Sequence, residues 1–148
     1  MTKLLRALPT LAALLCTACV GPQVEYKTEF EVFIGGENEV CTDDRCGGEG
    51  IGQASIEIKE GEGELCYDLD LEDIPDPTAA HIHEGGLGEN GPVVVDLEWD
   101  GAASGGSKCV DGLTQDVLRG IIENPRLRYL NVHSETYPDG AARGQFQT

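Results

Sequence analysis

The stretch Leu65-Cys66-Tyr67-Asp68-Leu69-Asp70-Leu71-Glu72 alternates one set of apolar side chains with a second, mostly acidic set. Successive side chains of a β-strand point to opposite faces of a sheet, so this pattern predicts a strand with one buried face and one solvated face. The stretches 30–34 and 54–59 alternate in the same way, and Gly61-Glu62-Gly63 is typical of a hairpin turn. The sequence therefore predicts antiparallel strands that each have one wet face.

Four further segments, 79–84, 92–98, 127–134 and 142–147, are also predicted as short strands. One segment breaks the period of two, because its apolar residues recur at helical spacing: Leu113, Val117, Leu118, Ile121 and Ile122. Asp111 or Thr114 could cap the start of this helix, and Asn124-Pro125 would end it. We expect an all-β fold: a Greek-key β-sandwich or barrel of about seven or more short antiparallel strands with one short helix in a crossover.

Length and charge narrow the class of protein. The chain has 148 residues, enough for one domain, with 10 Lys and Arg against 27 Asp and Glu and a net charge of −17. Nucleic acids and anionic membrane surfaces are polyanions that bind basic proteins. The composition therefore argues against nucleic acid as a partner, and against a membrane except through an anchor.

The first residues have the layout of an export signal. Lys3 and Arg6 precede a short apolar run, which is followed by small residues up to Ala18. We expect a signal peptide over 1–18, a tether over 19–27 and the folded domain over 28–148. The run ending in Ala18-Cys19 resembles a bacterial lipoprotein signal, in which the cysteine after the cut is lipidated, although Cys16 stands where leucine is usual. The alternative is ordinary cleavage, which would leave Cys19 free or paired and the protein secreted or periplasmic.

Four cysteines remain after the signal and Cys19, an even number that indicates disulfides in an oxidising compartment. Of the three possible pairings we favour Cys41 with Cys46, which closes a small acidic loop, and Cys66 with Cys109. A zinc site is disfavoured because the sequence has no Cys-x-x-Cys spacing.

The chemistry-bearing residues are the three histidines. His81 and His83 lie two apart on one predicted strand, so their imidazoles share a face while Ile82 faces the core. His133 lies on another predicted strand, where Asn131 and His133 are expected to point outward. If the two strands are neighbours, three imidazoles converge in an arrangement that suits copper or zinc. The alternative is that each histidine is a structural hydrogen-bonder, tied to Glu84, Asn131 or a backbone carbonyl.

Two segments resemble the signature blocks of the CHRD domain, a module of secreted proteins first described in chordin. They are Ala80-His81-Ile82-His83-Glu84-Gly85 through Asn90-Gly91-Pro92-Val93-Val94-Val95, and Tyr129-Leu130-Asn131-Val132-His133 through Tyr137-Pro138-Asp139-Gly140-Ala141-Ala142-Arg143-Gly144-Gln145. The resemblance spans about residues 28–147. It implies an extracellular all-β domain whose molecular activity is largely undefined.

A weaker resemblance bears on mechanism. His-x-His-Glu, a distant Val-His and a Gly-x-x-Arg turn are similar to the copper half of copper/zinc superoxide dismutases. This resemblance implies that His81, His83 and His133 are copper ligands and that Arg143 steers an anion. However, no histidine lies between 83 and 133 to act as the bridging or zinc ligand, and the chain lacks the positive field that draws in superoxide. Arg143 could instead pair with Glu84 or Asp139.

We therefore expect an exported CHRD module with a binding or structural role at the cell envelope and no catalytic turnover. Its partner would be an extracellular protein or an envelope component that the sequence does not name, and its only membrane contact would be the lipid on Cys19. The alternative is a copper-binding protein with a three-histidine site.

Overall fold

A computed structural model describes residues 28–99 and 101–148. The expected signal peptide, the tether and Cys19 lie outside these residues. The described part contains eight strands and one α-helix: β1 (Glu29–Gly35), β2 (Ile51–Lys59), β3 (Glu64–Glu72), β4 (Pro77–Glu84), β5 (Val93–Asp96), β6 (Gly105–Val110), α1 (Gln115–Glu123), β7 (Arg128–Ser134) and β8 (Ala142–Gln145). Three short 3-10 turns lie at Gly36–Asn38, Glu60–Glu62 and Pro125–Leu127.

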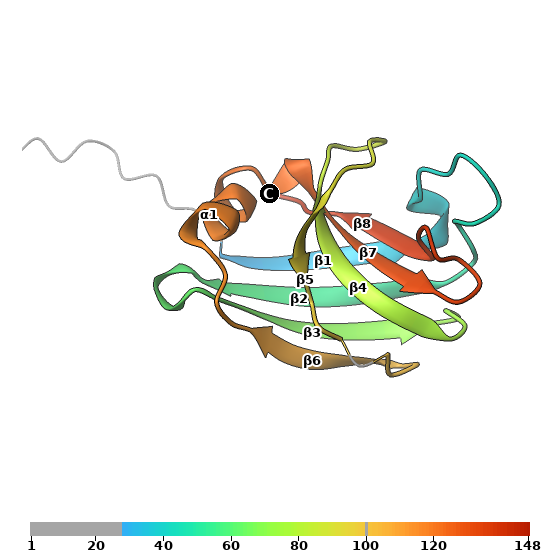
Figure 1. Ribbon diagram of the computed structural model, residues 1–148, viewed down its shortest axis with the longest axis horizontal. Helices are drawn as coiled ribbons and strands as arrows, with labels where there is room; N and C mark the ends of the chain where they lie inside the picture. Colours follow the sequence, from blue (N-terminus) through green and yellow to red (C-terminus); the bar gives the residue numbers. More distant parts are fainter. Residues whose placement is uncertain (1–27, 100) are drawn as a thin grey trace, which may run out of the picture.

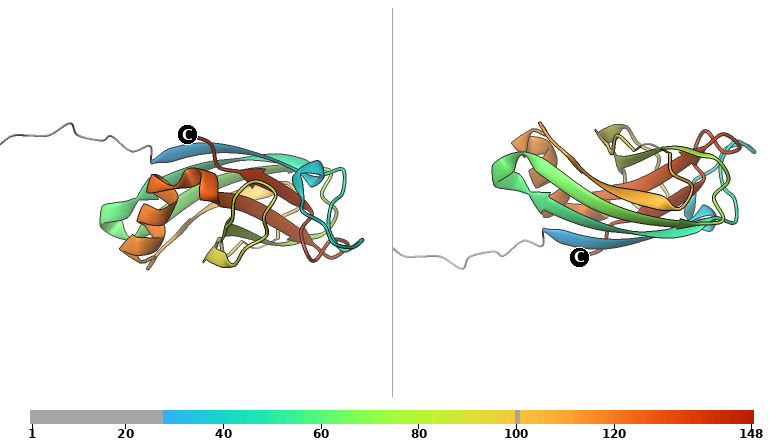
Figure 2. Two further views of the ribbon diagram at one scale, coloured as in Figure 1. Left: turned by 90° about the horizontal axis from the view of Figure 1, so that it is seen from above. Right: turned by 90° about the horizontal axis from the view of Figure 1, so that it is seen from below.

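All eight strands pair antiparallel in one sheet, in the order β5-β4-β7-β8-β1-β2-β3-β6. Figure 1 shows β1, β2, β3 and β6 one below another, with β4 crossing in front of them. The sheet curls into a half-barrel, and Figure 2 shows α1 lying at one end of the curl. The all-β expectation is confirmed, with a single curled sheet in place of two separate layers.

Along β3 the apolar side chains are buried and the acidic side chains between them are exposed, as the sequence predicts. Leu65, Tyr67, Leu69 and Leu71 are buried, while Asp68 and Asp70 are exposed. Similar alternation along β1 and β2 supplies more of the core inside the curl, whose buried apolar side chains include Phe30, Val32, Ile34, Ala54, Ile56 and Ile58. Gly63 turns the β2–β3 hairpin with a φ of 70°, a left-handed conformation that glycine adopts without steric cost.

The expected helix is confirmed, with Thr114 as its cap. The Thr114 side chain accepts a hydrogen bond from the Val117 backbone N–H. The buried face of α1 consists of Leu118, Ile121 and Ile122, and the helix ends at Glu123, with Asn124 as its C-cap. It connects β6 at one edge of the sheet to β7 in the other half, so it lies in a crossover.

Strand β6 is the element that the sequence did not predict. Only Gly105 and Val110 at its two ends are buried, so no alternation marks it. It pairs with β3 and places Cys109 directly opposite Cys66. Lys108 on β6 reaches across to the carboxylate of Glu98, just after β5, with Nζ and Oε2 2.8 Å apart. The two edges of the curled sheet are therefore linked by side chains.

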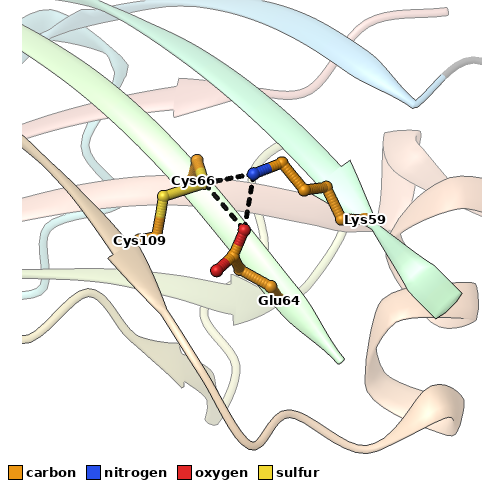
Figure 3. The surroundings of a disulfide bond; sticks show 4 residues. All are labelled: Lys59, Glu64, Cys66 and Cys109. Atoms are coloured by element: carbon orange, nitrogen blue, oxygen red, sulfur yellow. Dashed lines mark hydrogen bonds and ion pairs between the residues drawn. A yellow bond between two sulfur atoms is a disulfide. The ribbon is translucent and has the colours of Figure 1, made fainter. Parts of the chain in front are cut away.

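Both expected disulfides are confirmed. Cys41 is bonded to Cys46 in the loop after β1, and Cys66 to Cys109 across β3 and β6. Figure 3 shows the second bond with Lys59 and Glu64 beside Cys66. No helix in the described part of the chain is long and apolar enough to cross a membrane.

Candidate metal centre

The three histidines converge on one face of two neighbouring strands. His81 and His83 are on β4 and His133 is on β7, and the register pairs His81 with Asn131 and Ala79 with His133. The centroids of the His81 and His133 rings are 4.9 Å apart, and His83 lies 5.7 Å from His81 and 6.0 Å from His133. Each histidine offers one ring nitrogen, and these three nitrogens all lie within 4.8 Å of one another.

Hydrogen bonds to backbone carbonyls fix two of the rings. Nδ1 of His83 donates to the carbonyl oxygen of Gly91 (2.9 Å), and Nδ1 of His133 donates to that of Pro138 (3.0 Å). A carbonyl can only accept, so in the neutral ring Nδ1 carries the proton and Nε2 carries a lone pair. Metal-bound histidines typically have this arrangement, in which a second group holds the non-ligating nitrogen.

One ring nitrogen of each histidine is buried and lacks a hydrogen-bond partner among the described residues. Among the described residues, Nδ1 of His81 and Nε2 of both His83 and His133 accept or donate no hydrogen bond. A buried polar atom without a partner costs about 1–3 kcal/mol, so three such atoms in one cluster need an explanation. A bound cation would satisfy all three lone pairs together.

Burial favours the uncharged form of two of these rings, those of His83 and His133. Desolvation lowers the pKa of His83, and it also lowers the pKa of His133; the hydrogen bond that each donates from Nδ1 to a carbonyl opposes the change without reversing it. A neutral imidazole has the free lone pair that metal coordination needs. Two of the three rings therefore favour the form that can coordinate a metal.

The expectation that this face is solvated is wrong. Asn131 is only 4 % exposed and His83 8 %. Two loops that are far apart in the sequence, 36–50 and 85–91, fold over the face, and they meet where the Asn90 side-chain amide donates to the carbonyl oxygen of Val40 (2.8 Å). The alternation of β4 and β7 gives no sign of this cover, because it comes from loops and not from strands.

Arg143 holds one of these loops in place. Its Nη2 donates to the carbonyl oxygens of Gly86 (3.0 Å) and Glu89 (2.9 Å), and its Nη1 donates to the side-chain oxygen of Asn90 (3.0 Å). The guanidinium also lies 3.5 Å from the ring centroid of Tyr129. Because Arg143 is 1 % exposed and its donors are engaged, it has a positioning role at the loop and is not placed to steer an incoming anion.

The alternative pairing of Arg143 with Glu84 or Asp139 is also wrong. Asp139 forms an ion pair with Arg45 instead (3.2 Å). Glu84 is exposed at the end of β4, and its carboxylate lies 3.8 Å from Arg128. The structure therefore places Glu84 outside the histidine cluster, whereas Asn131 lies beside it.

Glu39 lies near the histidine cluster, and sequence reasoning did not single it out. Burial raises its pKa to about 7, although Arg143 and a hydrogen bond from Asn131 both act to lower it. Its Oε1 is buried and has no hydrogen-bond partner among the described residues, and its carboxylate lies against Gly140. In the sequence Glu39 is one of several acidic residues after the first strand, and no local pattern distinguishes it from its neighbours.

The comparisons with known proteins agree with this fold and with the signature blocks. The profile of the CHRD domain matches residues 30–146, which is most of the chain. The chain belongs to the CHRD domain family. CHRD domains are not a known enzyme family, and the two disulfides of this CHRD domain fit an extracellular protein. No curated protein and no solved structure shows significant similarity to the chain.

Proposed function

We propose that this protein is an exported CHRD module that binds copper through His81, His83 and His133. The observation that carries the proposal is the group of three buried imidazole nitrogens, close together and without hydrogen-bond partners. An all-imidazole donor set suits copper and zinc, and at a given nitrogen site Cu(II) generally binds more tightly than Zn(II). Copper is therefore the preferred ion and zinc the competitor.

The surroundings favour binding without turnover. A copper enzyme that acts on a small anion needs a positive field and an accessible cation near the metal. This chain has a net charge of −17, and its nearby arginine, Arg143, is buried with its donors directed at loop carbonyls. We infer that the module stores or carries the ion, or uses it to stabilise a binding surface for an extracellular protein or an envelope component.

A titration of the purified chain, made without a histidine tag, tests the proposal. We expect one equivalent of Cu(II) to bind tightly, and the His81→Ala variant to bind at least about a hundredfold more weakly because it loses one of three ligands. Glu84→Gln is the matched control, since Glu84 is on the same strand but exposed and outside the cluster; it should bind as the wild type does. No binding by the wild type, or equal binding by His81→Ala, would contradict the proposal.

We also propose that the protein is held at a membrane surface by lipid on Cys19. The support is the sequence Ala18-Cys19 after an apolar run, together with an even set of disulfide-bonded cysteines in the domain. The wild type should fractionate with membranes when it is expressed in bacteria, and Cys19→Ser should move to the soluble fraction. Unchanged partitioning of Cys19→Ser would contradict the anchor and leave the metal site unaffected.

A further inference from the structure

The Cys66–Cys109 disulfide lies in the half of the sheet away from the histidine-bearing strands. The two residues face each other on β3 and β6, and among the strands that the structure describes β6 is an edge strand paired only with β3. Cys109 is exposed and Cys66 is half-buried. An external reagent therefore has better access to the sulfur of Cys109 than to that of Cys66.

A charged pair stands at the sulfur of Cys66. Nζ of Lys59 lies 3.4 Å from Sγ of Cys66 and 2.6 Å from the Glu64 carboxylate, and the same carboxylate oxygen lies 3.3 Å from that sulfur. Figure 3 shows both side chains on the Cys66 side of the bond, where they crowd the approach to this sulfur. In the described part of the chain, no cationic group is hydrogen-bonded to either sulfur of the Cys41–Cys46 bond.

The greater exposure of Cys109 and the charged pair beside Cys66 act together in thiol–disulfide exchange. An attacking thiolate reacts fastest at an accessible sulfur when the other sulfur leaves as a stabilised thiolate. A neighbouring ammonium group stabilises a thiolate, and a neighbouring carboxylate destabilises it. Access favours attack at Cys109, and Lys59 favours departure of Cys66.

We propose that the Cys66–Cys109 disulfide is a thiol-exchange site, at which an external thiolate bonds to Sγ of Cys109 and Cys66 leaves as a thiolate beside Lys59. The nucleophile supplies the electron pair of the new S–S bond, and the electron pair of the broken bond stays on Sγ of Cys66. A second thiolate then displaces Cys109, which releases a low-molecular-weight disulfide and leaves two protein thiols. The reagent class is a thiol, which acts as the reductant.

Exchange at this bond would loosen one edge of the sheet. Once the bond is open, β6 is still held by its backbone hydrogen bonds to β3, by the buried side chain of Val110 and by the Lys108–Glu98 contact. The modified form thus carries an adduct on Cys109 and has a less constrained edge strand. This inference concerns the β3–β6 half of the sheet and does not depend on metal binding at the histidines.

The test is timed reaction of the folded, oxidised chain with 2-mercaptoethanol in the presence of a chelator. Samples are quenched with acid, alkylated and digested, and mass spectrometry locates the mixed disulfide. We expect the adduct on Cys109. We expect exchange at this bond to be about three- to tenfold slower in Lys59→Met, because the departing thiolate of Cys66 loses the ammonium group that stabilises it, which lies 3.4 Å from the sulfur. Lys59→Arg keeps the charge and should retain most of the rate.

Glu64→Gln should change the rate of exchange at the Cys66–Cys109 bond in the opposite direction to Lys59→Met. It removes the carboxylate beside the leaving sulfur, so exchange should become faster than in the wild type. The Cys41–Cys46 bond in the same samples is the internal reference, and its rate should not change in any of these variants. An adduct mainly on Cys66, or equal rates for wild type and Lys59→Met, would overturn the proposal. A parallel change at both disulfides would also overturn it, since that result indicates general loosening of the fold.

Discussion

The carboxyl group of Glu39 illustrates how a covered site changes the chemistry of a single residue. Its pKa is raised to about 7 because burial disfavours the ionised form more than Arg143 and Asn131 favour it. The folded protein therefore holds a proton on Glu39 between about pH 4.5 and pH 7, where the unfolded chain has lost it. A folded state that binds more protons becomes less stable as the pH rises through this window.

Replacing Glu39 with glutamine removes the loss of stability that ionisation of Glu39 causes as the pH rises. We expect Glu39→Gln to gain stability relative to the wild type as the pH rises from 5 to 8. The full pKa change corresponds to about 3 kcal/mol, and partial exposure reduces the expected gain to about 2 kcal/mol. Urea unfolding of the metal-free proteins at the two pH values measures it. If the free energies of unfolding of variant and wild type differ by the same amount at both pH values, Glu39 ionises normally in the folded state.

His83 and His133 contribute a pH dependence of the opposite sign. Their pKa values are lowered, so the unfolded chain takes up protons first when the pH falls below about 6.5, and the free energy of unfolding decreases. In the wild type the two effects offset each other in part. The comparison of variant with wild type at each pH isolates the contribution of Glu39, since the histidines are common to both proteins.

At this same scale, the sequence predicted the placement of the three histidines better than their surroundings. The His-x-His spacing on a strand places two imidazoles on one face whatever the fold, so His81 and His83 follow from local geometry. Convergence with His133 depended on the pairing of β4 with β7, a long-range contact that local periodicity does not encode. Glu39 and the loop role of Arg143 depend on how two loops fold over the sheet, so they could not be predicted from strand patterns.

Among the elements, α1 has the clearest local determinants. Thr114 accepts a hydrogen bond from the Val117 backbone N–H and satisfies one of the donors that a helix start leaves unpaired. We expect Thr114→Ala to lower the free energy of unfolding by about 1 kcal/mol. Urea denaturation followed by circular dichroism measures the change. Asp111→Ala is the control, since the side chain of Asp111 does not cap the helix; an equal loss in both variants would contradict this assignment.

Strand β6, in contrast to α1, has no local sequence pattern that predicts it. Its sequence Gly-Gly-Ser-Lys-Cys-Val lacks alternation because only its two ends are buried and its middle is an exposed edge. Pairing with β3 and the disulfide at Cys109 define it, and both are tertiary contacts. Strands with one buried face could be predicted from their periodicity, whereas this edge strand could not.

For the molecule as a whole, the two disulfides differ in how much chain they enclose. Cys41 and Cys46 are 5 residues apart, while Cys66 and Cys109 are 43 apart. Because a longer loop restricts the unfolded chain more, we expect the Cys66→Ser/Cys109→Ser variant to lose about 4 kcal/mol and Cys41→Ser/Cys46→Ser about 2 kcal/mol. Denaturation of the two double variants measures both losses. A larger loss from the small loop would indicate that native contacts of that loop, and not chain entropy, dominate.

If the protein is exported and binds copper as proposed, the path of the chain through the curled sheet has a consequence for the choice of ion. His81 and His83 are on β4, but β7 with His133 joins them only after β5, β6 and α1, and β7 is then flanked by β8, whose other neighbour is β1. The three nitrogens come together only when β4 has paired with β7, which lies further along the chain, after β5, β6 and α1. A polypeptide that passes through a translocation channel unfolded carries scattered imidazoles and no chelate. It would select its ion from the metals present where it folds, and not from those of the compartment in which it is synthesised.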